Sequence, residues 1–137
     1  MIEVRKISAA DDMDKAHAIR KMVFVEEQHC PPDLEWEYDE DAVHFLAAIN
    51  GMPCGAARWR TTGKGYKLER FAVLKEFRGQ GVGSALVRAV LEDLPADNRQ
   101  RYLNAQVDAV PLYLKFSFKP LGGLFEEAGI IHQQMVL

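Results

Sequence analysis

The feature that most constrains the fold is the segment from Phe71 to Leu94, where an apolar run leads through glycines into a helical pattern. The run from Phe71 to Leu74 is typical of a buried strand. Glycines stand at positions 79, 81 and 83, and from Val82 apolar residues recur at the spacing of an amphipathic helix that ends near residue 95. The pattern predicts a strand, a tight turn and a helix whose first amides lie beside the turn.

Two hairpins are predicted before this segment. Asn50-Gly51 lies between two apolar runs and is typical of a two-residue hairpin turn, and the glycines within residues 62–65 predict a second one. Three antiparallel strands therefore run in succession to Leu74. Before these three strands the sequence predicts an edge strand and then one helix, or two helices broken near Lys21. After the helix that ends near residue 95 it predicts a strand, a short helix containing Pro111 and a closing strand at residues 131–137.

This order of elements predicts a mixed α/β fold of the α+β type. A mostly antiparallel central sheet of about six to seven strands is expected to be flanked by helices. The length of 137 residues suits one domain, residues 1–137. The composition is that of a soluble protein, and no run of about 18 apolar residues or signal peptide is found, so a cytoplasmic protein without a membrane partner is expected.

The net charge and the spacing of cysteine and histidine residues indicate which partners are not expected. The net charge of −3 carries no footprint for nucleic-acid binding, so no nucleic-acid partner is expected. Cys30 and Cys54 lack metal or redox spacing and are predicted to be buried free thiols. The four histidines lack the i, i+4 spacing of a helical zinc site, so no metal is predicted.

The glycine turn is predicted to bind an anion, because the first amides of a helix lack partners and lie at its positive end. The plainer alternative is a tight turn without a ligand. A dinucleotide fingerprint is excluded because the glycines follow antiparallel hairpins in the wrong register, and a P-loop is excluded because Gly83-Ser84 has no preceding lysine.

The sequence Arg78-Gly79-Gln80-Gly81-Val82-Gly83 resembles the motif [QR]-x-x-G-x-[GA] of the GCN5-related N-acetyltransferase (GNAT) superfamily. The resemblance implies that this loop, with Ser84, binds the pyrophosphate of acetyl-CoA through its amides. It also implies the GNAT fold and an acyltransferase that uses acetyl-CoA as co-substrate and no metal.

Two further segments carry the same resemblance. The stretch QVDAVPLYLKFSF is similar to the family pattern N-x-x-A-x-x-x-Y-x-x-x-G-F, with Gln106 in place of Asn, Tyr113 matching and Ser117 in place of Gly. The front half, containing VFVEEQ, resembles a small bacterial ElaA-like or YjcF-like branch. It also resembles acyl-homoserine-lactone synthases, through Arg20, Val23 and Phe24, although those synthases are usually much longer.

The resemblance implies roles for several residues. The strand Phe71-Ala72-Val73 lends backbone groups to the pantetheine arm, with the Val73 amide near the thioester carbonyl, and Gln106 belongs to the acetyl-CoA site. Tyr113 is predicted to be the acid for the departing thiolate, the alternative being an aromatic on an apolar helix face. Glu69 is the candidate base, because alternation would place it on one sheet face with Phe71 and Val73, the alternative being a surface ion pair.

The acceptor is expected to be a small-molecule or peptide amine. The acidic stretch Asp33 to Asp41 would recognise a cationic amine or be a solvated loop, and Arg58 and Arg60 would reach an acceptor carboxylate or face solvent. A homodimer is compatible with this prediction. Two alternatives remain at this point: an acyl-CoA-binding sensor without catalysis, and a lactone-synthase-like acyltransferase.

Overall fold

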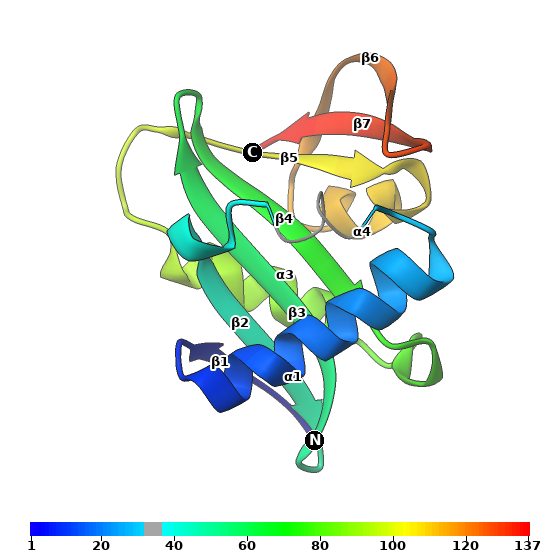
Figure 1. Ribbon diagram of the computed structural model, residues 1–137. Helices are drawn as coiled ribbons and strands as arrows, with labels where there is room; N and C mark the ends of the chain where they lie inside the picture. The colour runs from blue at the N-terminus through cyan, green and yellow to red at the C-terminus, as the bar shows by residue number, and fades with distance from the viewer. Residues whose placement is uncertain (32–36) are drawn as a thin grey trace.

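The computed structural model describes residues 1–31 and 37–137 and shows a single twisted sheet with helices on both faces (Figure 1). The sheet order is β1-β2-β3-β4-β5-β7-β6, and the β4–β5 pair is parallel whereas the other neighbours are antiparallel. The predicted mixed and mostly antiparallel fold is confirmed. The strands are β1 (Ile2–Ile7), β2 (Val43–Ile49), β3 (Met52–Thr62), β4 (Gly65–Val73), β5 (Gln100–Gln106), β6 (Lys119–Glu127) and β7 (Ile130–Val136).

Helices cover the sheet in two layers. On one face α1 (Ala10–Arg20) passes directly into the π-helical segment η1 (Lys21–Glu27), and on the other lies α3 (Val82–Asp93), as Figure 1 shows. The expected break near Lys21 is therefore a change of hydrogen-bond pattern within a continuous helix. The short α4 (Val110–Leu114) has Pro111 in its first turn, as predicted. No helix within the described ranges is long and apolar enough to cross a membrane.

Each face of the sheet has its own hydrophobic core. The larger core lies under α3, where Leu86, Val87 and Val90 are fully buried. The smaller core lies under α1 and includes Ile19 and Ala72. Residues of one strand can therefore be assigned to a face by the core that they join.

The first predicted hairpin is present between β2 and β3. Asn50 and Gly51 have φ values of 49° and 83°, the left-handed pair that a two-residue turn of this kind requires. The second hairpin joins β3 to β4, and Thr62 pairs with Gly65 across it. Strand β6 was not predicted, because sequence analysis found a single strand after the short helix.

A β-bulge interrupts β4 and overturns one expectation. Ala56 pairs with Ala72 and Arg58 with Glu69, so Arg70 and Phe71 together oppose one residue of β3, and Arg70 has a φ of 59°. The extra residue reverses the alternation. Phe71 and Val73 pack against the α3 core, whereas Ala72 joins the α1 core. The prediction that Glu69 shares a face with Phe71 and Val73 is therefore wrong, since Glu69 lies on the α1 face.

The two parallel strands pair along only part of their length. The β4–β5 ladder runs from Gly65 with Gln100 to Leu68 with Leu103 and then ends. Beyond Leu68 the edge of β4 that faces β5 has no ladder partner in the described sheet. The strands part there, and the opening between them positions the site described next.

Candidate active site

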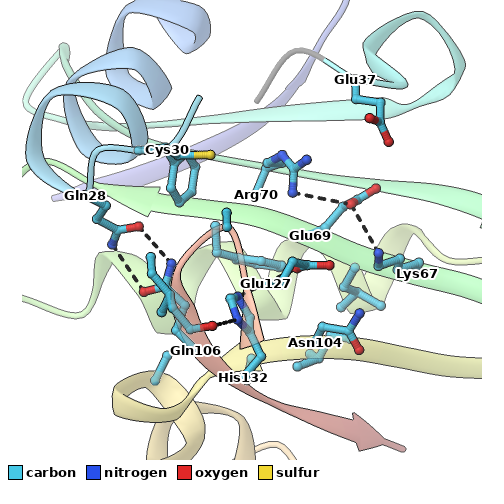
Figure 2. Close-up of a pocket in the computed structure, with 18 of the residues that line it drawn as sticks. Gln28, Cys30, Glu37, Lys67, Glu69, Arg70, Asn104, Gln106, Glu127 and His132 are labelled. Atoms are coloured by element: carbon cyan, nitrogen blue, oxygen red, sulfur yellow. Dashed lines mark hydrogen bonds and ion pairs between the residues drawn. The ribbon is translucent and has the colours of Figure 1, made fainter. Parts of the chain in front are cut away.

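A cavity of about 250 Å³ lies where β4 and β5 separate. Residues 67–71 of β4 form one side and residues 103–106 of β5 the other, while the end of η1, Tyr113 of α4 and residues of β6 and β7 close it. Figure 2 shows Lys67, Glu69 and Arg70 on one side and Gln106 and His132 on the other. The unusual separation of two neighbouring strands therefore creates the pocket.

Tyr113 reaches this cavity from α4. Its side chain is 6% exposed, and its ring meets the rings of Phe71 and Phe118 edge to face, with centroids 5.8 and 6.1 Å apart. Burial raises the pKa of the Tyr113 phenol well above its usual range. The phenol is therefore protonated at neutral pH and available as a proton or hydrogen-bond donor inside the cavity. The structure brings Tyr113 and Phe71 together, and the β4 bulge is what turns Phe71 toward it.

Glu69 lines the same cavity from β4 but is surrounded by cations. Its carboxylate contacts Arg60 directly and lies 3.3 Å from Arg58 and 3.7 Å from both Lys67 and Arg70. Burial by itself would raise the pKa of Glu69, but the attraction of Arg58 and the other cations outweighs it and holds the pKa below its usual range. Glu69 is thus a stable anion and a weaker proton acceptor than an isolated carboxylate.

Arg58 links Glu69 to the acidic stretch. It is 0% exposed, and its guanidinium donates to Asp39 Oδ1 at 2.5 Å. The equally buried Arg20 contacts the same oxygen at 2.8 Å. Both expectations for Arg58, an acceptor contact or a solvent-facing side chain, are wrong because these ion pairs bury it. Arg60 does line the cavity, with its guanidinium over the ring of Tyr38 at 4.0 Å from the centroid.

The acidic stretch divides into parts with different roles. Asp39 turns inward to the two arginines, and these contacts lower its pKa although burial opposes them. Glu37 and Tyr38 line the cavity. Two carboxylates of the stretch, Asp33 and Glu35, lie outside the described residues. The stretch is therefore neither a uniformly solvated loop nor a uniform recognition surface.

The glycine turn lies at the start of α3, next to the end of β4. Gly79 and Gly81 have φ values of 79° and 92°, and a Cβ built on Gly79 would meet nothing within 4 Å, so backbone conformation rather than crowding requires these glycines. Gly81 is the helix N-cap and supplies no side-chain cap, and the α-helical ladder begins with Ala85 donating to Gly81. The amides between them point out of the helix start. Residues 78–84 and Val73 do not line the cavity.

The side chain of Arg78 is held by protein groups. It forms two hydrogen bonds of 2.7 Å to the Glu27 carboxylate and donates from Nε to the Val73 carbonyl at 3.0 Å. The pKa of Glu27 is lowered chiefly by these hydrogen bonds. Arg78 thus ties the end of η1 to the turn after β4, a contact that the sequence motif does not reveal.

Gln106 is held in a similar way from the β5 side. Gln28 and Gln106 exchange two amide hydrogen bonds of 3.2 and 2.8 Å, drawn in Figure 2. Glu27 and Gln28, adjacent at the end of the π-helical segment, therefore contact the turn after β4, through Arg78, and the end of β5, through Gln106. The neighbouring Cys30 is in no disulfide, is only half-buried and lines the cavity, which corrects its predicted burial, whereas Cys54 is a buried free thiol as predicted.

Sequence reasoning missed two polar residues of the cavity. His132 of β7 is 7% exposed, and Asn104 of β5 carries a buried side-chain oxygen. The sequence assigns no role to either residue, and the pairing of β5 with β7 brings them to the same wall. Within the described part of the chain, no group of three or more histidine, cysteine or acidic side chains is arranged to hold a metal ion.

Comparison with known proteins identifies the family of this chain. The family model for the acetyltransferase (GNAT) domain matches residues 9–137, and the N-acetyltransferase YjcF of Bacillus subtilis is 38% identical over 130 residues, 92% of each chain. The chain belongs to the GNAT family of acetyltransferases. This GNAT chain is also similar to the crystal structure of Escherichia coli ElaA, with a TM-score of 0.82, 26% identity and coverage of 98% of this chain and 99% of ElaA.

A GNAT family acetyltransferase from Elizabethkingia anophelis, solved with acetyl-CoA bound, shares the GNAT fold. Its TM-score is 0.71 at 17% identity, and the match covers 98% of this chain and 94% of that one. The family assignment confirms the resemblance found in the sequence and favours neither the silent sensor nor the lactone-synthase alternative.

Proposed function

We propose that this GNAT chain transfers the acetyl group of acetyl-CoA to a primary amine, which attacks the thioester directly. The observation that carries the proposal is Tyr113, a protonated phenol in the cavity between the parted strands. The acceptor is proposed to be a small-molecule or peptide amine that enters the same cavity.

The residues beside the cavity fit the acetyl-CoA substrate. The edge of β4 at Phe71-Ala72-Val73 lies beyond the end of the β4–β5 ladder, so its backbone groups on that side can bond an extended amide chain such as pantetheine. The Val73 amide would polarise the thioester carbonyl. The amides of Gly79–Ser84, which includes Gln80 and Val82, lie at the uncapped start of α3 and suit the pyrophosphate.

Arg78 and Gln106 have a positioning role in this proposal. The Arg78 side chain is occupied by Glu27 and Val73, so its contribution to pyrophosphate binding is to hold the turn in place. Gln106 is occupied by Gln28 and fixes the end of β5 in the same way. Both contacts keep the two sides of the opening at a set separation.

Tyr113 supplies the proton that the leaving sulfur needs. Acetyl-CoA brings the activated acyl group, and the chain's own contribution is to hold the phenol proton beside the leaving position while excluding bulk water. Burial keeps that proton on the phenol at neutral pH, so Tyr113 is in the protonated form that can donate to the leaving sulfur. Glu69, predicted as the base, stays a prediction, and its lowered pKa makes it better suited to hold Arg60 and Arg70 at the cavity wall.

The proposal is tested by Tyr113→Phe, which keeps the ring and removes the phenol proton. Acceptor-dependent release of CoA thiol should fall about 10²-fold, whereas the affinity for acetyl-CoA measured by calorimetry should stay within two-fold. Tyr102→Phe is the matched control, because the Tyr102 hydroxyl bonds Thr62 at 2.6 Å and does not line the cavity. Normal turnover in the Tyr113 variant would remove its role as the acid.

A further inference from the structure

The cavity wall formed by β5 and β7 carries two side chains that accept hydrogen bonds. Gln106 pairs with His132 and Asn104 with Gln134 in the antiparallel β5–β7 ladder. Side chains of directly paired residues share a face, and residues two apart on one strand do so too. Asn104 and His132 are therefore diagonal neighbours on the face that looks into the cavity, as Figure 2 shows.

The hydrogen bond of His132 determines which nitrogen carries a proton. Its Nδ1 lies 2.8 Å from the Ile130 carbonyl oxygen, which can only accept, so Nδ1 is the donor. In the neutral ring Nε2 then carries the lone pair. Phe125 stacks on the ring at 5.7 Å between centroids with planes 24° apart, which holds its orientation. Although His132 is 7% exposed, it lines the cavity, so its lone pair is available to a molecule inside.

Asn104 supplies an independent indication that this wall receives a hydrogen-bond donor. Its Oδ1 is buried and has no hydrogen-bond partner among the described residues. A buried acceptor without a partner costs on the order of 1–3 kcal/mol, so such an atom in a cavity points to a ligand that donates. An amine or ammonium group is the donor that the proposed acetyl transfer brings into this space.

We propose that His132 is the general base that removes a proton from the acceptor ammonium, with Asn104 accepting a second hydrogen bond from it. The inference rests on the proposed acetyl transfer and concerns the same cavity. Imidazole is the side chain whose ordinary pKa lies nearest neutral pH, which suits a base. Glu69, the base suggested by the sequence, is engaged by four cations instead.

The protons and bonds of the reaction balance with this assignment. His132 Nε2 takes one proton from the ammonium, and the neutral amine attacks the carbonyl carbon of the thioester, forming the C–N bond as the C–S bond breaks. The departing thiolate takes the proton of Tyr113. The new amide nitrogen then gives its extra proton to the tyrosinate, which restores the phenol, and His132 returns its proton to solvent.

The charges around the imidazole are mixed. Glu127 of β6 lies 3.8 Å from Nε2, and its half-exposed carboxylate would stabilise the imidazolium once it forms. Asp108 is an exposed carboxylate on η4 (Val107–Ala109), the short 3-10 turn that packs on β7. Across the cavity Glu69 is balanced by Lys67 and Arg70. An acid therefore lies beside the base, where its negative charge favours proton uptake.

The test is His132→Asn, because the asparagine amide can keep the donor to Ile130 while removing the Nε2 lone pair. The assay measures CoA release with acetyl-CoA and the best acceptor from a panel of polyamines, amino sugars, amino acids and lysine peptides. We expect kcat/KM to fall about 10²-fold near pH 7. The deficit should narrow as the pH rises through the pKa of the acceptor amine, because the free amine then needs no base.

Two matched variants separate this role from others. Glu69→Gln should leave the shape of the pH profile unchanged, and His44→Gln, at a buried histidine that does not line the cavity, should do the same. A pH-independent loss in His132→Asn, or a loss confined to Glu69→Gln, overturns the assignment of His132. A wild-type protein that releases no acceptor-dependent CoA with any amine overturns acetyl transfer itself, and the base with it.

A measurement on the unsubstituted protein needs no turnover. Nitrogen-15 NMR of the imidazole rings reports the tautomer of His132 directly. A protonated Nδ1 and an unprotonated Nε2 in the neutral ring are expected, and addition of the acceptor amine should shift the Nε2 resonance. A protonated Nε2 in the neutral ring would contradict the proposal even if His132→Asn failed to fold.

Discussion

Replacing Arg58 by methionine should destabilise the fold strongly at neutral pH. Arg58 is fully buried and stands between two carboxylates, with Asp39 Oδ1 at 2.5 Å and Glu69 Oε1 at 3.3 Å. Methionine fills similar space but leaves both carboxylates without their shared cation. Breaking a buried pair by removing one partner costs about 3–5 kcal/mol, and Arg20 and Arg60, which remain beside the two acids, favour the lower end of that range.

The loss of stability in Arg58→Met should be larger at neutral pH than at acidic pH. In the folded protein the pKa values of Asp39 and Glu69 are lowered from their ordinary values of 3.8 and 4.5. Groups of this kind contribute stability that is present above the unfolded pKa and lost as the pH falls through the folded pKa. Arg58→Met removes part of that contribution. Its deficit should therefore be complete at about pH 7 and shrink as the pH falls below about 4.

Urea denaturation followed by circular dichroism at several pH values measures both effects, because the midpoint and slope give the free energy of unfolding. Arg58→Lys should lose less of the free energy of unfolding than Arg58→Met, because lysine keeps the positive charge. It should still lose some, because lysine has a single donor group in place of the guanidinium. Arg88→Met, on the exposed surface of α3, should change the free energy of unfolding by less than about 0.5 kcal/mol. A deficit below about 1 kcal/mol for Arg58→Met, or one that does not change with pH, would refute the reasoning.

Three further outcomes are expected. Glu27→Gln should raise KM for acetyl-CoA about five-fold with kcat within two-fold in steady-state assays, since a half-exposed bidentate pair that holds Arg78 is worth about 1 kcal/mol. Gly81→Ala should lower the free energy of unfolding by about 1–2 kcal/mol and weaken acetyl-CoA binding in calorimetry, because its φ is 92°. Burial lowers the pKa of His44, so the melting temperature should fall as the pH drops below about 6.5, and His44→Gln should flatten that step.

Much of the fold could be predicted because its signals are local. The turn residues Asn50-Gly51, the apolar stripe of α3 and Pro111 at the start of α4 each act over a few residues, and the structure confirms all three. Strand β6 escaped prediction because it is almost entirely exposed and contains Pro120 and two glycines, so it shows no alternation to read. Only its pairing with β7 makes it a strand.

Residues of the site could be predicted from the sequence only where they belong to a recognised motif. Tyr113 could be placed by spacing along the chain, but Asn104 and His132 meet through a strand pairing between segments about thirty residues apart, which spacing does not encode. The sequence places Arg78 in the loop predicted to bind pyrophosphate, whereas the fold brings Glu27 to its side chain across 51 positions. Contacts of this range depend on how the η1 segment crosses the strand ends.

The bulge at Arg70 explains why strand alternation failed where it mattered most. With regular alternation Phe71 would lie on the α1 face beside Glu69, away from the core that contains Tyr113. The inserted residue instead sends Glu69 to the charged side and Phe71 to the aromatic side, so one short segment of β4 lines the cavity with both kinds of surface. A bulge leaves one residue of the strand outside the ladder, and here it also requires a left-handed backbone conformation at Arg70, whose φ is 59°. The bulge in the β3–β4 ladder comes just after Leu68, the last β4 residue paired with β5, so the separation of the strands and the change of face occur at the same point of β4.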